Sequence, residues 1–322
     1  TLFNHNLKME DKPTKVIFAG QLEFGTSRNF ENVQTQYAHR MEHYYKNDIL
    51  LKPESIFNPD ERTMDIPRTV VTSTDRQYKN TVNLLERIAT FSIAGDLNIW
   101  RLNGIGQMMD HRLFEPRADR TTNQLFRKGR EMLDQAEHIG EAKELLTKAI
   151  DNFERHAVAY ERRGVINYKL GNHKDALYDF TKSIKIYASK PESYYGRGLI
   201  YFSKEEEDLD KAIADFGTVA KYAIPHQKIY WLAKRMRADA LRKAGRTDEA
   251  RKDYASFVNR KQQLPGLESY DRLAAFRLGE ILLSQDNKEE AAQAFQRALE
   301  APDDSRAPKE SDIQAKLAEA QA

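Results

Sequence analysis

The strongest constraint on the fold of this chain is a pattern that occurs five times between residue 122 and about residue 300. In each copy a small residue is followed, in a second segment, by an alanine and then, four residues later, by a bulky residue. The alanines lie 34, 36, 38 and 41 residues apart, a period that indicates stacked helical hairpins. The small residues are Gly129, Gly164, Gly198, Ala238 and Gly279; the alanines are Ala142, Ala176, Ala212, Ala250 and Ala291; the bulky residues are Leu146, Phe180, Phe216, Tyr254 and Phe295.

The residue types give a physical reason for the pattern. Two antiparallel helices approach closely only where a side chain is nearly absent, so we expect the small residue of the first helix to face the alanine of the second. The bulky residue at i+4 lies on the same face one turn later. One hairpin cannot bury that face alone, and neighbouring hairpins therefore share a core.

The second copy, residues 157–187, resembles the tetratricopeptide repeat. It departs from the usual pattern at Arg163, where that family has leucine, and it lacks the late proline. The third copy matches as well, whereas the first and fourth are weaker. The resemblance implies an α-solenoid but names no function by itself. The matching residues of the second copy are Tyr160, Gly164, Tyr168, Gly171, Ala176, Phe180 and Ser183.

The sequence predicts a mainly α protein with a repeat domain and a small N-terminal α+β domain. Strand patterns over 15–24, 63–73 and 97–114 alternate with helix patterns over 28–46 and 76–94, which indicates two helices covering one face of a mixed sheet. Pro67 places its strand at an edge or a bulge. We identify no family for this part. The predicted divisions are a polar arm over 1–12, an α+β domain over 13–116, a linker over 117–121, and a repeat domain with a C-terminal capping helix over 122–322.

Composition excludes several classes of protein. The mean hydropathy is −0.74 and no apolar run is long enough to span a bilayer. A net charge of +2 argues against bulk nucleic-acid binding, and the absence of cysteine excludes disulfides, thiolate metal sites and cysteine nucleophiles. This composition suits a soluble protein, and it is as compatible with the cytoplasm as with a periplasmic or secreted location. Because the chain begins at Thr1 rather than Met, a removed upstream segment stays open.

One motif has the spacing of a metal site. His39, Glu42 and His43 form H-x-x-E-H, which resembles the zinc motif of inverzincin proteases. Histidines at i and i+4 share a helix face, and the glutamate could activate a metal-bound water. A third acidic ligand is needed, and Glu115 is the one candidate at a broadly similar separation. We favour two exposed histidines on a surface helix, and we predict no cofactor and no metal.

The family resemblance implies that the first helices of the hairpins line a concave groove. Counted from the small residue of each copy, the groove positions carry mainly aromatic and basic side chains, which often anchor protein interfaces. They predict a protein or peptide partner with acidic or apolar groups, although each aromatic residue could equally pack between hairpins. The positions are Phe126, Arg127, Arg130, Glu161, Arg162, Tyr168, Lys169, Tyr195, Leu199, Phe202, Arg235, Met236, Arg242, Lys243, Phe276, Arg277 and Leu283.

Three functional hypotheses follow from the sequence. The first is a non-enzymatic scaffold or adaptor that binds a partner in the groove, while the N-terminal domain makes a second contact or self-associates through the strand near Pro67. Val165 and Leu199 stand where the chaperone-binding members of the family have asparagine, which argues against a chaperone C-terminus as ligand. The alternatives are a metallohydrolase using the histidine motif and an RNA-binding repeat protein, against which the low net charge and the acidic loop 205–208 count.

Overall fold

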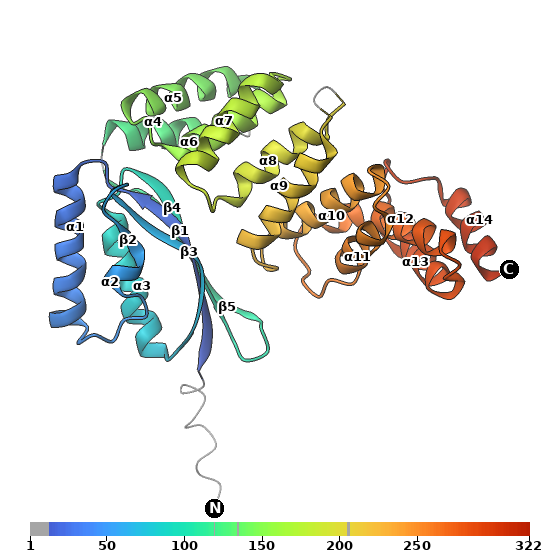
Figure 1. Cartoon of the computed structure of the whole chain (residues 1–322), viewed down its shortest axis with the longest axis horizontal. Coiled ribbons are helices and arrows are strands. Elements are labelled where there is room, and N and C mark those ends of the chain that lie inside the picture. The colour runs from blue at the N-terminus through green and yellow to red at the C-terminus, as the bar shows by residue number, and fades with distance from the viewer. Residues whose placement is uncertain (1–12, 119, 134, 205–206) are drawn as a thin grey trace, which may run out of the picture. The chain divides into compact units, whose positions relative to one another are not determined.

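The computed structural model describes residues 13–118, 120–133, 135–204 and 207–322. The predicted arm over residues 1–12 lies outside this part of the chain. Contacts divide the chain into two compact units, one up to Ser193 and one from Tyr194 onward, and each is described by itself (Figure 1). The first unit holds both a sheet and the first two hairpins. The proposed boundary at residues 117–121 therefore remains a prediction.

The first unit contains one five-stranded sheet, in which every pairing is antiparallel. The expectation of a mixed sheet is wrong. β3 and β4 run in the same direction, as a strand–helix–strand connection suggests, but β1 lies between them and pairs with both. In the order β2-β3-β1-β4-β5 the strands are Phe57–Asn58, Thr63–Ser73, Thr14–Glu23, Ala94–Leu102 and Met108–Phe114.

Helices α1 (Ser27–His39) and α3 (Asp75–Ala89) share a core with the sheet. A capping box formed by Thr74 and Gln77 begins α3. The helical segment after β1 continues through a π-helical turn, Arg40–Tyr44, and a short helix α2, Pro53–Ile56, precedes β2. The register of β3 shifts opposite Phe18–Gly20, which confirms a bulge beside Pro67.

Five helical hairpins follow, as the repeat predicts. A final helix packs against α13 and α12, in the place expected for a cap. Short 3₁₀ turns at Ala136–His138 and Glu268–Tyr270 precede α5 and α12. The hairpins are α4 (Thr121–Glu131) with α5 (Ile139–Asn152), α6 (Ala157–Lys169) with α7 (His173–Ile186), α8 (Pro191–Phe202) with α9 (Leu209–Tyr222), α10 (Lys228–Lys243) with α11 (Thr247–Val258), and α12 (Asp271–Ser284) with α13 (Lys288–Glu300); the final helix α14 is Glu310–Gln321.

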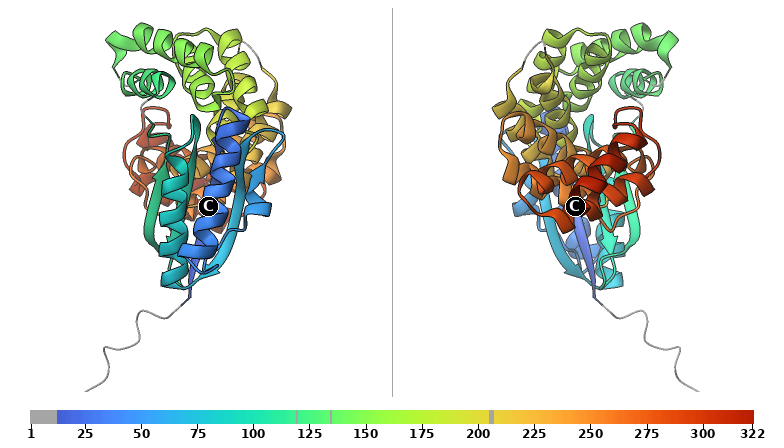
Figure 2. Two further views of the ribbon diagram at one scale, coloured as in Figure 1. Left: turned by 90° about the vertical axis from the view of Figure 1, so that its left-hand side faces the viewer. Right: turned by 90° about the vertical axis from the view of Figure 1, so that its right-hand side faces the viewer.

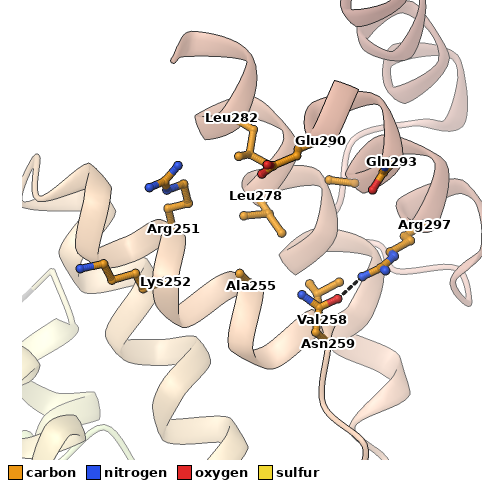
Figure 3. Close-up of a pocket in the computed structure, with 11 residues that line it drawn as sticks. Arg251, Lys252, Ala255, Val258, Asn259, Leu278, Leu282, Glu290, Gln293 and Arg297 are labelled. Atoms are coloured by element: carbon orange, nitrogen blue, oxygen red, sulfur yellow. Dashed lines mark hydrogen bonds between the residues drawn. The ribbon is translucent and has the colours of Figure 1, made fainter. Parts of the chain in front are cut away.

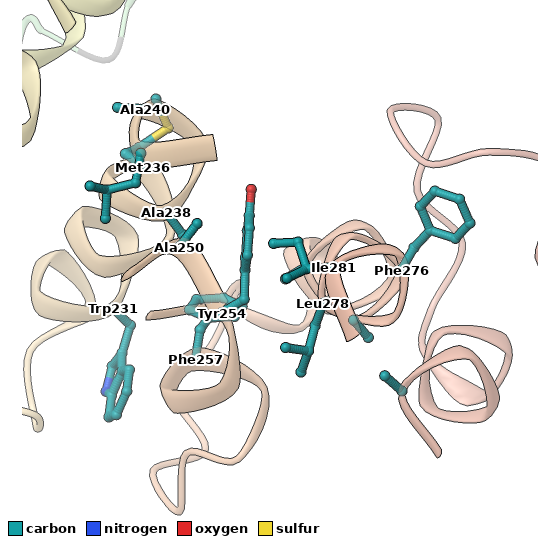
Figure 4. Packing of buried hydrophobic residues seen from close by; sticks show 14 of the residues in the cluster. Trp231, Met236, Ala238, Ala240, Ala250, Tyr254, Phe257, Phe276, Leu278 and Ile281 are labelled. Carbon is teal, nitrogen blue, oxygen red and sulfur yellow. The ribbon is translucent and has the colours of Figure 1, made fainter. Parts of the chain in front are cut away.

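The glycines of the second, third and fifth hairpins make room for a phenylalanine ring rather than for an alanine, whereas Gly129 of the first lies against Leu146 and the backbone of Ala142. A methyl group added at Gly198 would lie 2.8 Å from the ring of Phe216, and one added at Gly279 would lie 2.6 Å from the ring of Phe295. The expected contact between the glycine and the alanine is therefore corrected. The closest partner of the glycine is the bulky residue that lies four positions after that alanine. In the second unit, Tyr254 belongs to the same buried core as α10 and α12 (Figure 4).

Candidate functional site

The sheet of the first unit lies against the second hairpin and occupies part of the predicted groove. Asp96 of β4 accepts hydrogen bonds from Nζ of Lys190, at 2.5 Å, and from the hydroxyl of Tyr187, at 3.4 Å. Gln21 of β1 donates to the carbonyl of Ile186 at 3.1 Å. Through these contacts two neighbouring strands, β1 and β4, pack against the hairpin formed by α6 and α7.

Two predicted groove residues belong to this junction. Glu161 is only 2 % exposed, and its burial raises the pKa of its carboxyl group. Its Oε2 lies 3.2 Å from Nε of Arg162; the charge of Asp96 acts on both side chains, and that of Lys190 acts on Glu161. The groove assignment is therefore corrected for Glu161, because this side chain contacts other parts of its own chain.

The predicted groove residues of the first hairpin also have internal partners. Phe126 is buried, with its ring 4.6 Å from that of His156. Arg130 forms an ion pair with Glu115 and lies over the Phe126 ring. Arg127 is half-buried and donates to the carbonyl of Asn123 at 3.4 Å. Phe126 is thus a core residue rather than a groove contact.

In the second unit, several groove candidates form a network around one buried carboxylate. Asp239 accepts hydrogen bonds from Arg235, at 3.0 Å, and from Arg277 and the hydroxyl of Tyr254. The Arg235 guanidinium also lies 4.6 Å from the centre of the Tyr270 ring. Because both arginines neutralise Asp239, they stabilise the hairpins from within. Two further candidates from this region are buried: Met236 and Phe276.

The accessible groove candidates lie near the ends of the first helices. Lys169, Arg242 and Lys243 are exposed, whereas Tyr168, Tyr195 and Phe202 are half-buried. Lys243 forms an ion pair with Glu207 and lies 5.7 Å from the centre of the Phe202 ring. Within the second unit, this leaves a small basic and aromatic surface at the end of α8 and of α10.

The histidine motif lies at the exposed end of α1. The rings of His39 and His43 are 4.7 Å apart, and Glu42 lies 3.8 Å from His43. Glu115, the acid considered as a third ligand, is instead paired with Arg130. Among the described residues, no group of three or more histidine, aspartate or glutamate side chains is arranged to hold a metal ion. Within the same residues, none of the helices has the length and apolar character needed to cross a bilayer.

Sequence reasoning missed a repeated ion pair. In the second, third and fourth hairpins, the arginine that precedes the small residue binds the aspartate three positions after the alanine. Both oxygens of each aspartate accept from the guanidinium, at distances between 2.6 and 3.0 Å. We call this the arginine–aspartate ladder; its pairs are Arg163–Asp179, Arg197–Asp215 and Arg237–Asp253. The signal that could have revealed it was Arg163 in the place of the family leucine.

Comparisons with known proteins agree with this architecture. A curated relative, a TPR repeat-containing protein of Methanocaldococcus jannaschii, is 34% identical over 83 residues, which make up 26% of this chain and 14% of that protein. This chain therefore spans only a small part of that relative.

Two solved structures are similar in fold alone. MamA from Desulfovibrio magneticus is 15% identical, with 56% of this chain and 94% of that chain covered and a TM-score of 0.46. YrrB, described as a TPR protein with an unusual peptide-binding site, is 17% identical, with 61% and 88% covered and a TM-score of 0.44.

The family model described as tetratricopeptide repeat matches residues 128–191, 204–265 and 235–306. Because these matches cover more than half of the chain, this protein belongs to the tetratricopeptide repeat family.

Proposed function

We propose that this protein is a non-enzymatic interaction scaffold that binds a protein or peptide through the groove side of its repeats. The observation that carries the proposal is the surface formed in the second unit by exposed Arg242 and Lys243 beside half-buried Phe202. Stacked hairpins present extended concave surfaces for partners, and aromatic and arginine side chains are frequent anchors there. The charge of Arg242 favours a partner with carboxylates, whereas that of Lys243 is paired with Glu207.

The choice of variants for a test depends on the internal ion pairs. Replacing Arg235 by glutamate would set a second carboxylate beside buried Asp239, so a loss of binding would be confounded with a loss of stability. Arg242 is exposed, which makes it the better probe.

We predict that Arg242→Glu weakens binding of acidic peptides by about tenfold or more, because it removes one cation and adds one repulsive charge. Fluorescence anisotropy against a labelled acidic peptide library measures this effect. Lys288→Glu is the matched control, since Lys288 is an exposed cation at the start of α13, a second helix. If wild type and Arg242→Glu bind the peptide equally and have the same circular dichroism spectrum, this surface is not the binding site.

The N-terminal domain is proposed to make a second contact through a strand edge. β2 pairs only with Thr63 and Met64, so among the described residues no strand lies beside the outer side of β3 from Val70 to Ser73. The side chain of Val70 is half exposed, and exposed strand edges readily add another strand. Sedimentation velocity of Val70→Lys tests self-association through this edge.

A further inference from the structure

The arginine–aspartate ladder fills the space between consecutive second helices. Arg163 reaches past its partner on α7 and donates to the hydroxyl of Thr147 on α5 at 3.1 Å. Arg237 does the same in the second unit: its guanidinium binds Asp253 on α11, and a methyl group added at Gly217 of α9 would lie 3.3 Å from its Nη1. In each case one guanidinium spans the gap from one second helix to the next.

The ladder stops at the fifth hairpin, although the hairpin itself continues. Leu278 stands where the second, third and fourth hairpins have arginine, and Ala294 stands where they have aspartate. On the neighbouring second helix, Ala255 takes the position of Gly217. Leu278 and Ala294 are shorter than the arginine and aspartate they replace, and a cleft of about 550 Å³ lies between α11, α12 and α13, a volume in the range of ligand pockets.

The floor and the rim of this cleft differ in chemistry. Leu278 and Leu282 of α12 form an apolar floor between the two second helices, as Figure 3 shows. Arg251 and Lys252 project from α11 on one side, and Arg297 projects from α13 on the other. The rim thus carries three cations against a single carboxylate, which belongs to Glu290.

The rim cations have few internal partners among the described residues, although the charge of Lys252 acts on Glu249. Arg297 donates to the neutral side chain of Asn259. Within the part of the chain that the structure describes, neither Arg251 nor Lys252 forms a side-chain hydrogen bond or ion pair. In contrast, Arg237 on the first helix of the same hairpin is paired with Asp253. Two effects would therefore stabilise a complex. An apolar side chain of the ligand would be buried on the floor of the cleft, and carboxylates of the ligand would pair with these cations.

We infer that this cleft is a second peptide-binding site, separate from the groove side of the repeats. Its occupant is a segment of a partner protein with one leucine or phenylalanine side chain, which enters the apolar floor, and with aspartate or glutamate on both sides. The positive rim selects the carboxylates, and the shape of the floor selects the anchor. This site does not depend on the groove residues, so the two proposals can fail separately.

The test restores the ladder at the fifth hairpin. A labelled peptide with one central phenylalanine flanked by glutamates is titrated into wild type and into the double variant Leu278→Arg with Ala294→Asp. We expect binding to weaken by at least about tenfold, because the new pair would fill the cleft as the arginine does in three other hairpins. Arg242→Glu, the groove variant, should leave the affinity of the cleft for this peptide unchanged. Competition measurements at the cleft check this.

Two surface variants test the charge of the rim without disturbing the floor. Arg251→Glu should weaken the same peptide by about tenfold, and Glu290→Gln should strengthen it by a few fold, because it removes the only repulsive carboxylate. Replacing the central phenylalanine of the peptide by alanine, or its glutamates by glutamines, should abolish measurable binding.

Three outcomes would overturn the inference. One is equal affinity for the peptide in wild type and in a folded double variant. Another is failure of wild type to bind the phenylalanine peptide at all. The third is concentration-dependent dimerisation of wild type that the double variant abolishes in sedimentation experiments, since the occupant would then be a second copy of this chain. If the double variant does not fold, opposite effects of Arg251→Glu and Glu290→Gln still decide the question.

Discussion

At the scale of single residues, His156 shows how burial fixes a charge state. Its Nδ1 accepts from the backbone N–H of Ala159 at 3.2 Å and so caps α6, while its ring packs on Phe126. Burial lowers the pKa of His156 to about 3, so the folded protein keeps it neutral across the physiological range. In the unfolded chain it gains a proton below about pH 6.5. Its contribution to stability is therefore complete above that pH and is lost as the pH falls toward 3.

We predict that the free-energy difference of unfolding between wild type and His156→Asn shrinks by about 1.4 kcal/mol for each pH unit below 6.5. Asparagine keeps a capping acceptor but does not titrate. Urea titrations at pH 7.5, 6.5 and 5.5 in a Trp231→Phe background, where Trp100 alone reports on the first unit, measure the difference. A difference that is constant with pH would mean that His156 is protonated inside the fold.

At the scale of helices and hairpins, the ladder replaces an apolar contact by a buried ion pair. Asp253 is only 4 % exposed, and it accepts from Arg237 through both oxygens. The fifth hairpin shows that leucine and alanine serve at the same two positions. Buried pairs of this kind cost more when one partner is removed than when both are replaced by apolar residues.

We therefore predict that Arg237→Leu alone destabilises the second unit by about 3 kcal/mol, because it leaves a buried carboxylate with only Lys234 nearby, at 3.7 Å. Adding Asp253→Ala should recover most of the loss. Unfolding followed by Trp231 fluorescence in a Trp100→Phe background measures both variants. Equal costs for the single and the double variant would show that the two side chains do not act as a pair.

At the scale of the whole molecule, the sheet and the first two hairpins form one compact unit through buried charges. Lys190 is 5 % exposed and binds Asp96 of β4, and Arg155, just before α6, donates three hydrogen bonds to the carboxylate of Glu23 of β1. Burial raises the pKa of Glu23 to about 7, despite Arg155. This junction buries Glu161, a predicted groove residue of α6, so the proposed groove surface rests on the later hairpins.

We predict that Lys190→Met lowers the stability of the first unit by about 3 kcal/mol, because it leaves Asp96 buried without its cation. The second unit should be unaffected. Trp100 and Trp231 lie in different units, so single-tryptophan backgrounds separate the two unfolding transitions. Adding Asp96→Asn should restore part of the loss. A loss of equal size in both transitions would contradict the division of the chain into two units.

The sequence by itself determined the hairpins, because glycine, alanine and phenylalanine at fixed spacing leave a pair of helices few other ways to pack. It also indicated the longer strands and helices of the N-terminal domain, and an edge or a bulge at Pro67, since local patterns report local structure. It did not predict the short elements α2 and β2. Only the tertiary structure decided that the sheet is antiparallel, with β1 between two strands that run in one direction.

The same holds for the candidate sites. The family resemblance implied that Glu161, Arg235 and Arg277 line a groove, but a side chain's exposure depends on which distant residues it meets. Asp96 lies far from Glu161 in sequence, and Asp239 meets Arg277 only when two hairpins stack. The break in the ladder at Leu278 was visible in the sequence, yet it became a cleft only once α11 and α13 were set side by side.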